Sequence, residues 1–244
     1  MKTKILNYIL ALITFGAFIL LIAFLADTDN FQMQLLVNYR GLIIKGFMNT
    51  LIVSFLSLIL SIVLGFILYI MQKSNMGYFV ALGDVFTEII YGTPMLVLIV
   101  ITRYVIGPAF NYSDTFVLGI IAIVLYMAPY MTNVFKAAIS SIGDDQYIAI
   151  ELFGFTSYQK YRYIIMPQII KQLMPPMMNN LSLIIKGSAL LHAISYTELF
   201  YAIKIAQSKT FAYIEGYILL WLLYLVVTIP LSQLTKYVER RYGV

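Results

Sequence analysis

Residues 144–167 read DDQYIAIELFGFTSYQKYRYIIMP and form the longest stretch of mixed character in an otherwise strongly apolar chain. The stretch begins with acidic and amide residues, continues with tyrosines around Lys160 and Arg162, and ends at Pro167. Placing charged side chains in the hydrocarbon of a bilayer is costly. The stretch is therefore expected to lie outside the membrane, and the composition of the remaining chain tests that expectation.

The composition is that of a membrane protein. Of the 244 residues, 61% are hydrophobic and only 11% are charged, whereas about a quarter of the residues in a soluble domain are charged. The apolar runs are continuous and long enough for spanning helices, which need about twenty residues, while barrel strands alternate over about ten. These features predict an all-α polytopic membrane protein. The absence of cysteine excludes disulfides and thiolate metal sites, and no metal site is predicted.

Six apolar segments have a length at or near that of a membrane span. They cover about 5–26, 46–71, 84–106, 115–138, 173–198 and 212–235. The first has an apolar core longer than that of a cleaved signal peptide and no clear cleavage site, so we interpret it as a retained anchor.

The distribution of cations predicts the orientation. With a cytoplasmic N-terminus, ten cations fall inside, five fall outside, and Lys186 falls within a span. The positive-inside rule then favours two cytoplasmic termini and places residues 144–167 in the largest cytoplasmic loop. The ten inside cations are Lys2, Lys4, Lys73, Lys136, Lys160, Arg162, Lys171, Lys236, Arg240 and Arg241. Because the cations follow the spans and form no single basic face, we expect no nucleic-acid partner.

The loop itself predicts two short helices. Residues 146–153 are typical of a helix that is closed by Gly154, the residue best suited to a left-handed C-terminal cap. Thr156 or Ser157 can cap a second helix, which Pro167 is expected to end.

The second helix carries one apolar and aromatic face. Tyr158, Tyr161, Ile164 and Ile165 recur at spacings of three and four residues. Two interpretations remain open at this point: a docking element for another protein, or an amphipathic hairpin that lies on the lipid surface.

The loop resembles the cytoplasmic signature loop of ABC importer permeases, and in particular that of the polar amino-acid uptake family. The resemblance is carried by Gln146-x-x-Ala149-x-x-x-Phe153-Gly154, continuing through Tyr161-Arg162-Tyr163 to Ile165-Met166-Pro167-Gln168. Further matches follow in consistent order over about residues 41–244. They include Gly46-Phe47-x-Asn49-Thr50, Tyr91-Gly92-Thr93-Pro94, Pro175-Pro176, Ile185-Lys186 and Glu198-Leu199.

The resemblance implies a type I importer transmembrane domain. It implies five core helices over residues 41–244, with a coupling loop at about 140–170, and the first forty residues add an anchor helix and an external loop. The implied function is translocation of a polar amino acid or derivative across the bacterial cytoplasmic membrane by alternating access. The implied partners are two ATPase subunits, a second permease copy or a related chain, an extracellular substrate-binding protein and membrane lipids.

In this family ATP and magnesium belong to the partner ATPase, so the chain is expected to hold no cofactor and no catalytic residue. It contains no Gly-Lys dipeptide, and therefore no phosphate-cradling Walker A loop. The implied contacts with the ATPase are made by Gln146, Tyr147, Ala149, Phe153, Gly154, Tyr158, Tyr161, Arg162 and Pro167.

The sequence departs from the family pattern at five positions. The signature acid of the loop is replaced by Ile148 and a small residue by Ile150. An arginine is replaced by Tyr91, an acid near the end of the fourth span by Asn133, and an acid after the lysine by Gly187.

Polar and helix-disturbing residues within the spans are candidates for the translocation path or its gate, because ionisable groups are costly there. These candidates are Glu88, Thr93, Pro94, Asn133, Asn179, Lys186 and Ser188. The alternative for each is a structural role: Glu88 at the interface, an ion pair of Lys186 with Glu88 or Glu198, and the asparagines and Ser188 in helix-to-helix contacts.

Two other functional classes compete with a transport subunit: a membrane-embedded enzyme, and a non-ABC channel or scaffold. An enzyme of that kind needs a nucleophile with a base or a metal cluster. One histidine, His192, and no cysteine leave little from which to build either.

Overall fold

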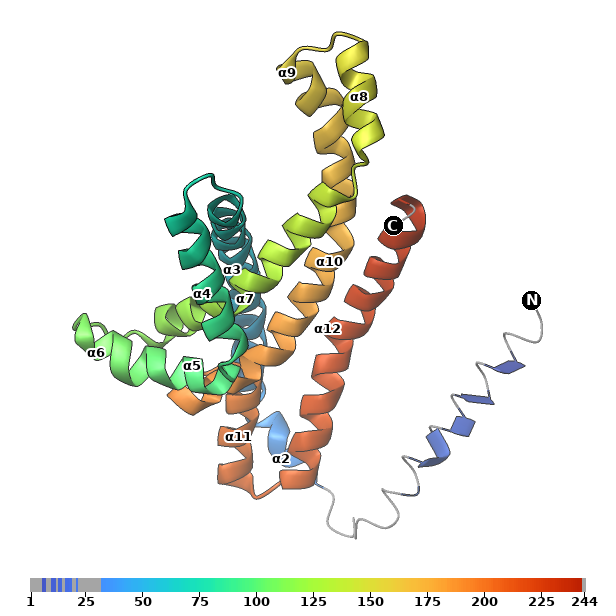
Figure 1. Ribbon diagram of the computed structural model, residues 1–244. Coiled ribbons are helices and arrows are strands. Elements are labelled where there is room, and N and C mark those ends of the chain that lie inside the picture. The colour runs from blue at the N-terminus through green and yellow to red at the C-terminus, as the bar shows by residue number, and fades with distance from the viewer. Residues whose placement is uncertain are drawn as a thin grey trace.

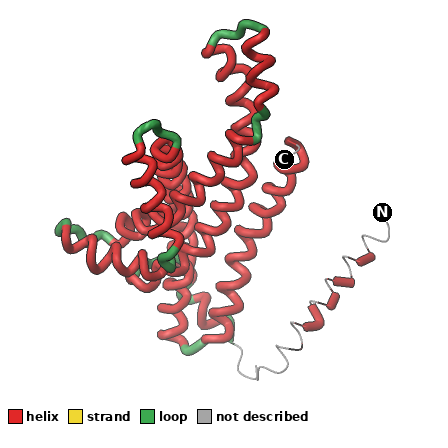
Figure 2. The backbone as a smooth tube through the Cα atoms, viewed as in Figure 1, coloured by secondary structure: helices red, strands yellow, loops and turns green. Residues whose placement is uncertain are grey.

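The computed structural model describes residues 32–242 continuously and ten isolated helical positions between residues 6 and 21. The described residues form helices and connecting turns, with no strand (Figure 2). The centre of the fold is a bundle of α3 (Arg40–Gln72), α7 (Thr115–Ser140) and α10 (Met166–Gly187). The predicted all-α class is therefore confirmed for this part of the chain.

The remaining elements surround this bundle (Figure 1). The helices α4 (Gly77–Tyr91), α5 (Met95–Ile101), η1 (Thr102–Ile106) and α6 (Gly107–Ala109) lie on one side, and α12 (Tyr213–Tyr242) flanks α10. At one end of the bundle lie α2 (Gln34–Val37) and α11 (Leu199–Thr210). A hairpin of α8 (Asp144–Leu152) and α9 (Ser157–Gln159) projects from the other end and joins α7 to α10.

Three described helices, α3, α7 and α12, are long and apolar enough to cross a membrane. They match the segments predicted at 46–71, 115–138 and 212–235. The segment predicted at about 5–26 falls largely outside the described residues and stays a prediction.

The span predicted at 84–106 is broken. The chain bends by 107° between α4 and residues 95–109, at Gly92-Thr93-Pro94. Pro94 lacks a backbone N–H and disfavours the helical conformation of the residue before it, and it precedes α5 in an extended conformation.

The segment predicted as a single span at 173–198 is also divided. Its helix α10 starts earlier, at Met166, and ends at Gly187. The following 3₁₀ helix η3 (Ser188–Ile194) stops at Ser195, which has a left-handed φ of 60°. A run of 3₁₀ helix longer than a few residues is uncommon. The regular helix therefore ends at Gly187, although the composition alone favours one straight helix through this segment.

The helix α3 packs through a stripe of small residues. Ser54, Ser57 and Ser61 are fully buried, and Gly46 and Gly65 lie on the same side of the helix. A Cβ atom on Gly46 would lie 2.6 Å from the Ala202 Cβ. Small residues allow helices in a membrane to approach closely, which increases their van der Waals contact.

At Gly65 the contact with α7 involves both backbones. A Cβ atom there would overlap the Cβ of Met131 and lie 2.9 Å from the Ala128 carbonyl oxygen. The Thr132 hydroxyl donates a hydrogen bond of 2.9 Å to the Gly65 carbonyl. This pair of helices therefore has no room for a side chain at position 65.

A Gly65→Ala substitution is expected to destabilise the folded protein by about 1–3 kcal/mol, because extra methyl groups in a tight contact force backbone shifts. Gly41→Ala is the matched control in the same helix, since a Cβ at Gly41 meets nothing within 4 Å. Thermal unfolding of the two variants in detergent measures the effect. An equal transition temperature for both would contradict the close contact.

Candidate functional site

The first half of the hairpin is a capped helix. In α8, Asp144 and Asp145 occupy the first turn, where their negative charges interact favourably with the helix dipole and stabilise the helix. The helix ends at Leu152, Phe153 is its C-cap, and Gly154 follows with a left-handed φ of 68°. The structure therefore has the predicted helix and the predicted glycine cap.

The second half starts at a capping box. The Thr156 hydroxyl accepts a bond of 3.3 Å from the Gln159 N–H, and the Thr156 N–H donates one of 3.0 Å to Gln159 Oε1. Thr156 is thus the cap of α9, and Ser157 is its first helical residue.

The prediction that Pro167 ends the second helix is wrong. From α9 the chain continues through the π-helix η2 (Lys160–Ile165) directly into α10, and Pro167 lies in the first turn of α10. A proline cannot donate to the carbonyl four residues before it. The wider π-helical turn, with bonds to the fifth residue, offers the proline a position in a continuous helix.

The foot of the hairpin is an apolar cluster that joins it to α7 and α10. Its buried members are Ala138, Ile142, Ile150, Ile165 and Ile169. Tyr147 packs against this cluster, and the Lys160 ammonium lies 4.7 Å from the centre of the Tyr147 ring. Ile150, a departure from the family pattern, therefore fills the core of the foot.

The predicted single face of the second helix is divided. Ile164 and Ile165 pack into the foot, whereas Tyr158 and Tyr161 are 69% and 52% exposed. The π-helical turn changes the angular step per residue, which separates positions that a regular helix would align.

The tip of the hairpin exposes large apolar side chains. Leu152 and Phe153 are 83% and 81% exposed, and Ile148 is 56% exposed. Gln146, Ala149 and Arg162 are also exposed. Leu152 was not among the predicted contact residues, although its position next to Phe153 at the helix end is a signal for it.

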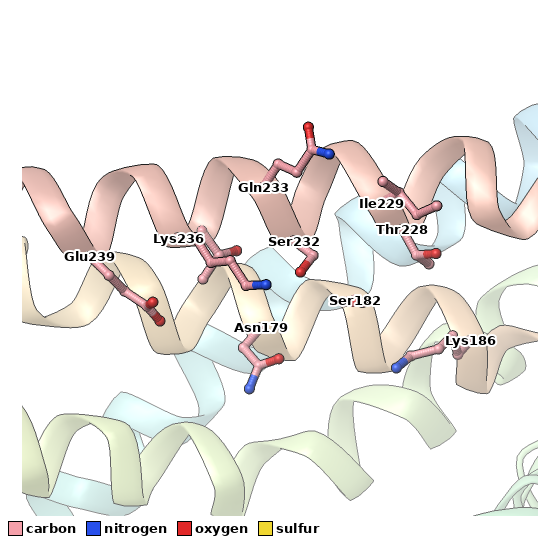
Figure 3. A pocket seen from close by; sticks show the side chains of 10 residues that line it. Asn179, Ser182, Lys186, Thr228, Ile229, Ser232, Gln233, Lys236 and Glu239 are labelled. Atoms are coloured by element: carbon pink, nitrogen blue, oxygen red, sulfur yellow. The ribbon is translucent and has the colours of Figure 1, made fainter. Parts of the chain in front are cut away.

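A polar groove of about 560 Å³ lies between α10 and α12 (Figure 3). It brings together two predicted path residues, Asn179 and Lys186. The other lining residues are Ser182, Thr228, Ile229, Ser232, Gln233, Thr235, Lys236 and Glu239. Figure 3 shows the side chains of Lys236 and Glu239 directed from α12 toward α10.

The α12 side of this groove was missed by sequence reasoning. Its signal is the spacing of Thr228, Ser232, Thr235 and Glu239 by three or four residues, which puts them on one face of the helix. Apolar residues between them keep the mean hydropathy of the segment as high as that of a membrane span.

Lys186 has no carboxylate partner among the described residues. The predicted pairing with Glu198 is absent, because the Glu198 carboxylate is fully buried and accepts bonds of 2.7 and 2.8 Å from the N–H groups of Phe200 and Tyr201. Glu198 therefore caps α11. The Lys186 side chain is exposed to the groove.

Asn133 lies apart from the groove, on α7, and pairs with Tyr91 of α4. The Asn133 amide donates a hydrogen bond of 2.7 Å to the Tyr91 hydroxyl. The Tyr91 ring also contacts Tyr130, which packs against Tyr126. Tyr91 and Asn133, the two positions at which the resemblance implies charged residues, thus contact each other as an uncharged pair.

The other candidates lie at backbone irregularities. Thr93 donates to the Ile89 carbonyl at the break before Pro94, and the exposed Glu88 lies one turn earlier. Ser188, the C-cap of α10, is fully buried and donates to the Ile185 carbonyl in the last turn of that helix. The structure therefore does not bring these residues into the α10–α12 groove.

Comparison with known proteins gives the fold and these sites a context. The sequence profile described as "Binding-protein-dependent transport system inner membrane component" matches residues 61–244. The chain is 31% identical over 213 residues to a probable glutamine ABC transporter permease protein, GlnM, of Bacillus subtilis, covering 87% of this chain and 94% of that one. It is 27% identical to the histidine/lysine/arginine/ornithine transport system permease protein HisQ of Escherichia coli, over 86% and 97%.

Solved structures agree. A crystal structure of an amino acid ABC transporter with histidines superposes with a TM-score of 0.76 at 29% identity, covering 84% of this chain and 96% of that one. An inward-facing MetNI methionine ABC transporter gives a TM-score of 0.67 over 83% and 97%. Its identity of 17% shows the fold alone.

The Tyr91–Asn133 contact can be measured by a double-mutant cycle. Tyr91→Phe and Asn133→Leu each remove one partner, and we expect a coupling of about 0.5–1 kcal/mol in the stability of the detergent-solubilised protein, as for other hydrogen bonds between membrane helices. Tyr104→Phe with Asn133→Leu is the control cycle, because Tyr104 is exposed and makes no hydrogen bond to Asn133. Equal coupling in the two cycles would contradict a specific contact.

Proposed function

The chain belongs to the family of binding-protein-dependent transport system inner membrane components, and we propose that it carries a polar amino acid or a close derivative across the bacterial cytoplasmic membrane. It is a transport subunit, the permease of an ABC importer, and ATP hydrolysis resides in a separate subunit. Two relatives that this chain matches over 94% and 97% of their length are named as permeases, one for glutamine and one for histidine, lysine, arginine and ornithine. These names support an amino-acid cargo.

The hairpin tip is the observation that carries the proposal. A protein that keeps Leu152 and Phe153 more than 80% exposed at the end of a capped helix offers them to a partner. Large apolar side chains that enter a pocket at the centre of an interface supply most of its binding energy. The proposed occupant is the ATPase subunit, which binds ATP and magnesium, with one hairpin on each of two ATPases.

The foot of the hairpin supports transmission of force. Its apolar cluster contains residues of α7, α8, η2 and α10, so a movement of the tip is passed to two helices of the bundle at once. Alternating access needs such a connection between the docked motor and the membrane core.

The α10–α12 groove supports a role in the path of the cargo. An ionisable side chain within a span is a functional candidate, because its charge is costly unless a partner or water is present. The exposed Lys186 ammonium suits the carboxylate of an amino acid, and Asn179 and Ser182 add amide and hydroxyl groups. Glu88, Thr93, Pro94 and Asn133 belong to the helix break and its neighbour, which we propose as a gate.

The remaining partners follow from the same proposal. A second permease copy, or a related chain, would complete the membrane core, and an extracellular binding protein would deliver the cargo. Both termini are proposed to face the cytoplasm, on the hairpin side of the membrane, with residues 1–40 as an additional anchor.

Replacing Phe153 by alanine is expected to weaken binding of the ATPase by about thirtyfold, since truncation of a central apolar anchor costs about 2 kcal/mol or more. Co-purification with the ATPase and the cargo-stimulated rate of ATP hydrolysis measure the effect. Phe110→Ala is the matched control, because Phe110 is 78% exposed but lies between α6 and α7, away from the hairpin. Unchanged co-purification for Phe153→Ala would remove the basis of the proposed docking.

A Lys186→Gln variant is expected to lower uptake of the cargo at least about fivefold, since a charge-assisted contact is lost, while ATPase binding is retained. Uptake of labelled amino acids into proteoliposomes, with the binding protein present, measures this. Lys204→Gln serves as the control, because Lys204 is also an exposed lysine and lies on α11, outside the groove. Equal uptake by both variants would show that Lys186 does not contact the cargo.

A further inference from the structure

A separate polar cavity of about 490 Å³ lies where α3, α4 and α7 meet near the ends of α3 and α7. Its lining residues are Tyr69, Gln72, Lys73, Asp84, Lys136, Ile139 and Ser140. None of them belongs to the hairpin tip or to the α10–α12 groove, and the proposed transport function does not use them.

The cavity is cationic. Lys73 is the C-cap of α3, and Lys136 lies on the last turns of α7. Both side chains are exposed, and neither forms an ion pair with a residue that the structure describes. The lining carries one carboxylate, Asp84, so its net charge is positive. Two unpaired ammonium groups on one concavity favour an anionic ligand.

The cavity also lies at the level of a membrane surface. The spans α3 and α7 end at Gln72 and Ser140, next to the cavity. Beside the two lysines, the Tyr69 ring and the Ile139 side chain add apolar wall. Basic pockets between membrane helices bind the head groups of anionic lipids.

We propose that this cavity binds the phosphate of an anionic phospholipid from the leaflet on the hairpin side. Lys73 and Lys136 contact the phosphate oxygens, and the acyl chains continue along the apolar surface of α3 and α4. Exposed apolar side chains there include Phe66, Ile70 and Leu82.

A docked ATPase is a less suitable occupant. The nine residues of α8 alone add about 13 Å of helix beyond α7. Figure 1 shows the turn between α3 and α4 set well back from the hairpin tip. A soluble phosphate compound would use the same two lysines but would gain nothing from the neighbouring bilayer, so the experiment below separates it from a lipid.

The cavity adjoins the foot of the hairpin. Ile139 lines the cavity and also packs against the foot cluster, which contains Ile150 of α8. A bound lipid therefore contacts residues that hold the hairpin, and anionic lipid is expected to stabilise the hairpin against thermal unfolding.

The test compares lipids retained by the purified full-length protein after exchange into equal mixtures of phosphatidylglycerol and phosphatidylcholine, counted by native mass spectrometry. The double variant Lys73→Gln with Lys136→Gln is expected to lose its preference for phosphatidylglycerol at least about fivefold, since each basic residue contributes about that factor near a membrane surface. Lys73→Arg with Lys136→Arg keeps the charge and is expected to retain the preference. Asp84→Asn is expected to strengthen it.

The matched control is Lys204→Gln with Lys209→Gln, which removes two exposed lysines from α11 at the opposite end of the bundle. Equal preference in the two glutamine double variants would overturn the proposal. The proposal would also be overturned if millimolar glycerol phosphate bound to the same two lysines whatever the proportion of phosphatidylglycerol in the mixture. That result would identify the ligand as a soluble phosphate compound. Reduced ATPase co-purification with unchanged lipid retention would assign the lysines to the partner protein instead. Lipid retention is measured without transport, so its outcome is independent of the proposed function.

Discussion

The close approach of α3 and α7 at Gly65 is the contact on which the rest of the structure depends. Lipid gives no hydrophobic driving force between apolar helices, so packing and hydrogen bonds must hold them together. Position 65 places one backbone directly against the other, and the Thr132 hydroxyl bonds across the contact. With α3 and α7 fixed in this way, α7 becomes a rigid support whose far end carries the hairpin.

The same reasoning explains where the chain is irregular. A membrane leaves no water for unpaired backbone groups, so breaks are tolerated only where protein or an aqueous cavity satisfies them. The break at residues 92–94 is covered by the Thr93 hydroxyl and by packing against α7. The turn between η3 and α11 is closed by Asn49 and Thr50 of α3, which bond to the Thr197 carbonyl and the Leu199 N–H. Glu198 completes that turn as the cap of α11.

The features that the sequence predicted correctly depend on local chemistry. A glycine cap and a threonine capping box act within a few residues, so α8 and the start of α9 could be assigned from 144–159. The three long spans follow from continuous apolar runs. The errors arose where tertiary structure decides: the π-helical turn that carries the chain past Pro167, the 107° bend at Pro94, and the 3₁₀ segment after Gly187. Composition could not separate these from straight helices.

The parts of the candidate site that depend on residues close together in the sequence were predictable, and the parts that depend on distant residues were not. The apolar tip at Phe153 adjoins its own cap, whereas the groove at Lys186 requires a face of α12 about fifty residues away in sequence, and the Tyr91–Asn133 bond joins residues 42 positions apart.

The Tyr91–Asn133 bond also changes how the departures from the family pattern are understood. Considered separately, Tyr91 and Asn133 each stand where the resemblance implies a charged residue. Considered together, they form one contact in which the Asn133 amide donates to the Tyr91 hydroxyl, so these two groups satisfy each other in the membrane. The helix break and α7 can therefore stay connected without an ion pair between these two positions.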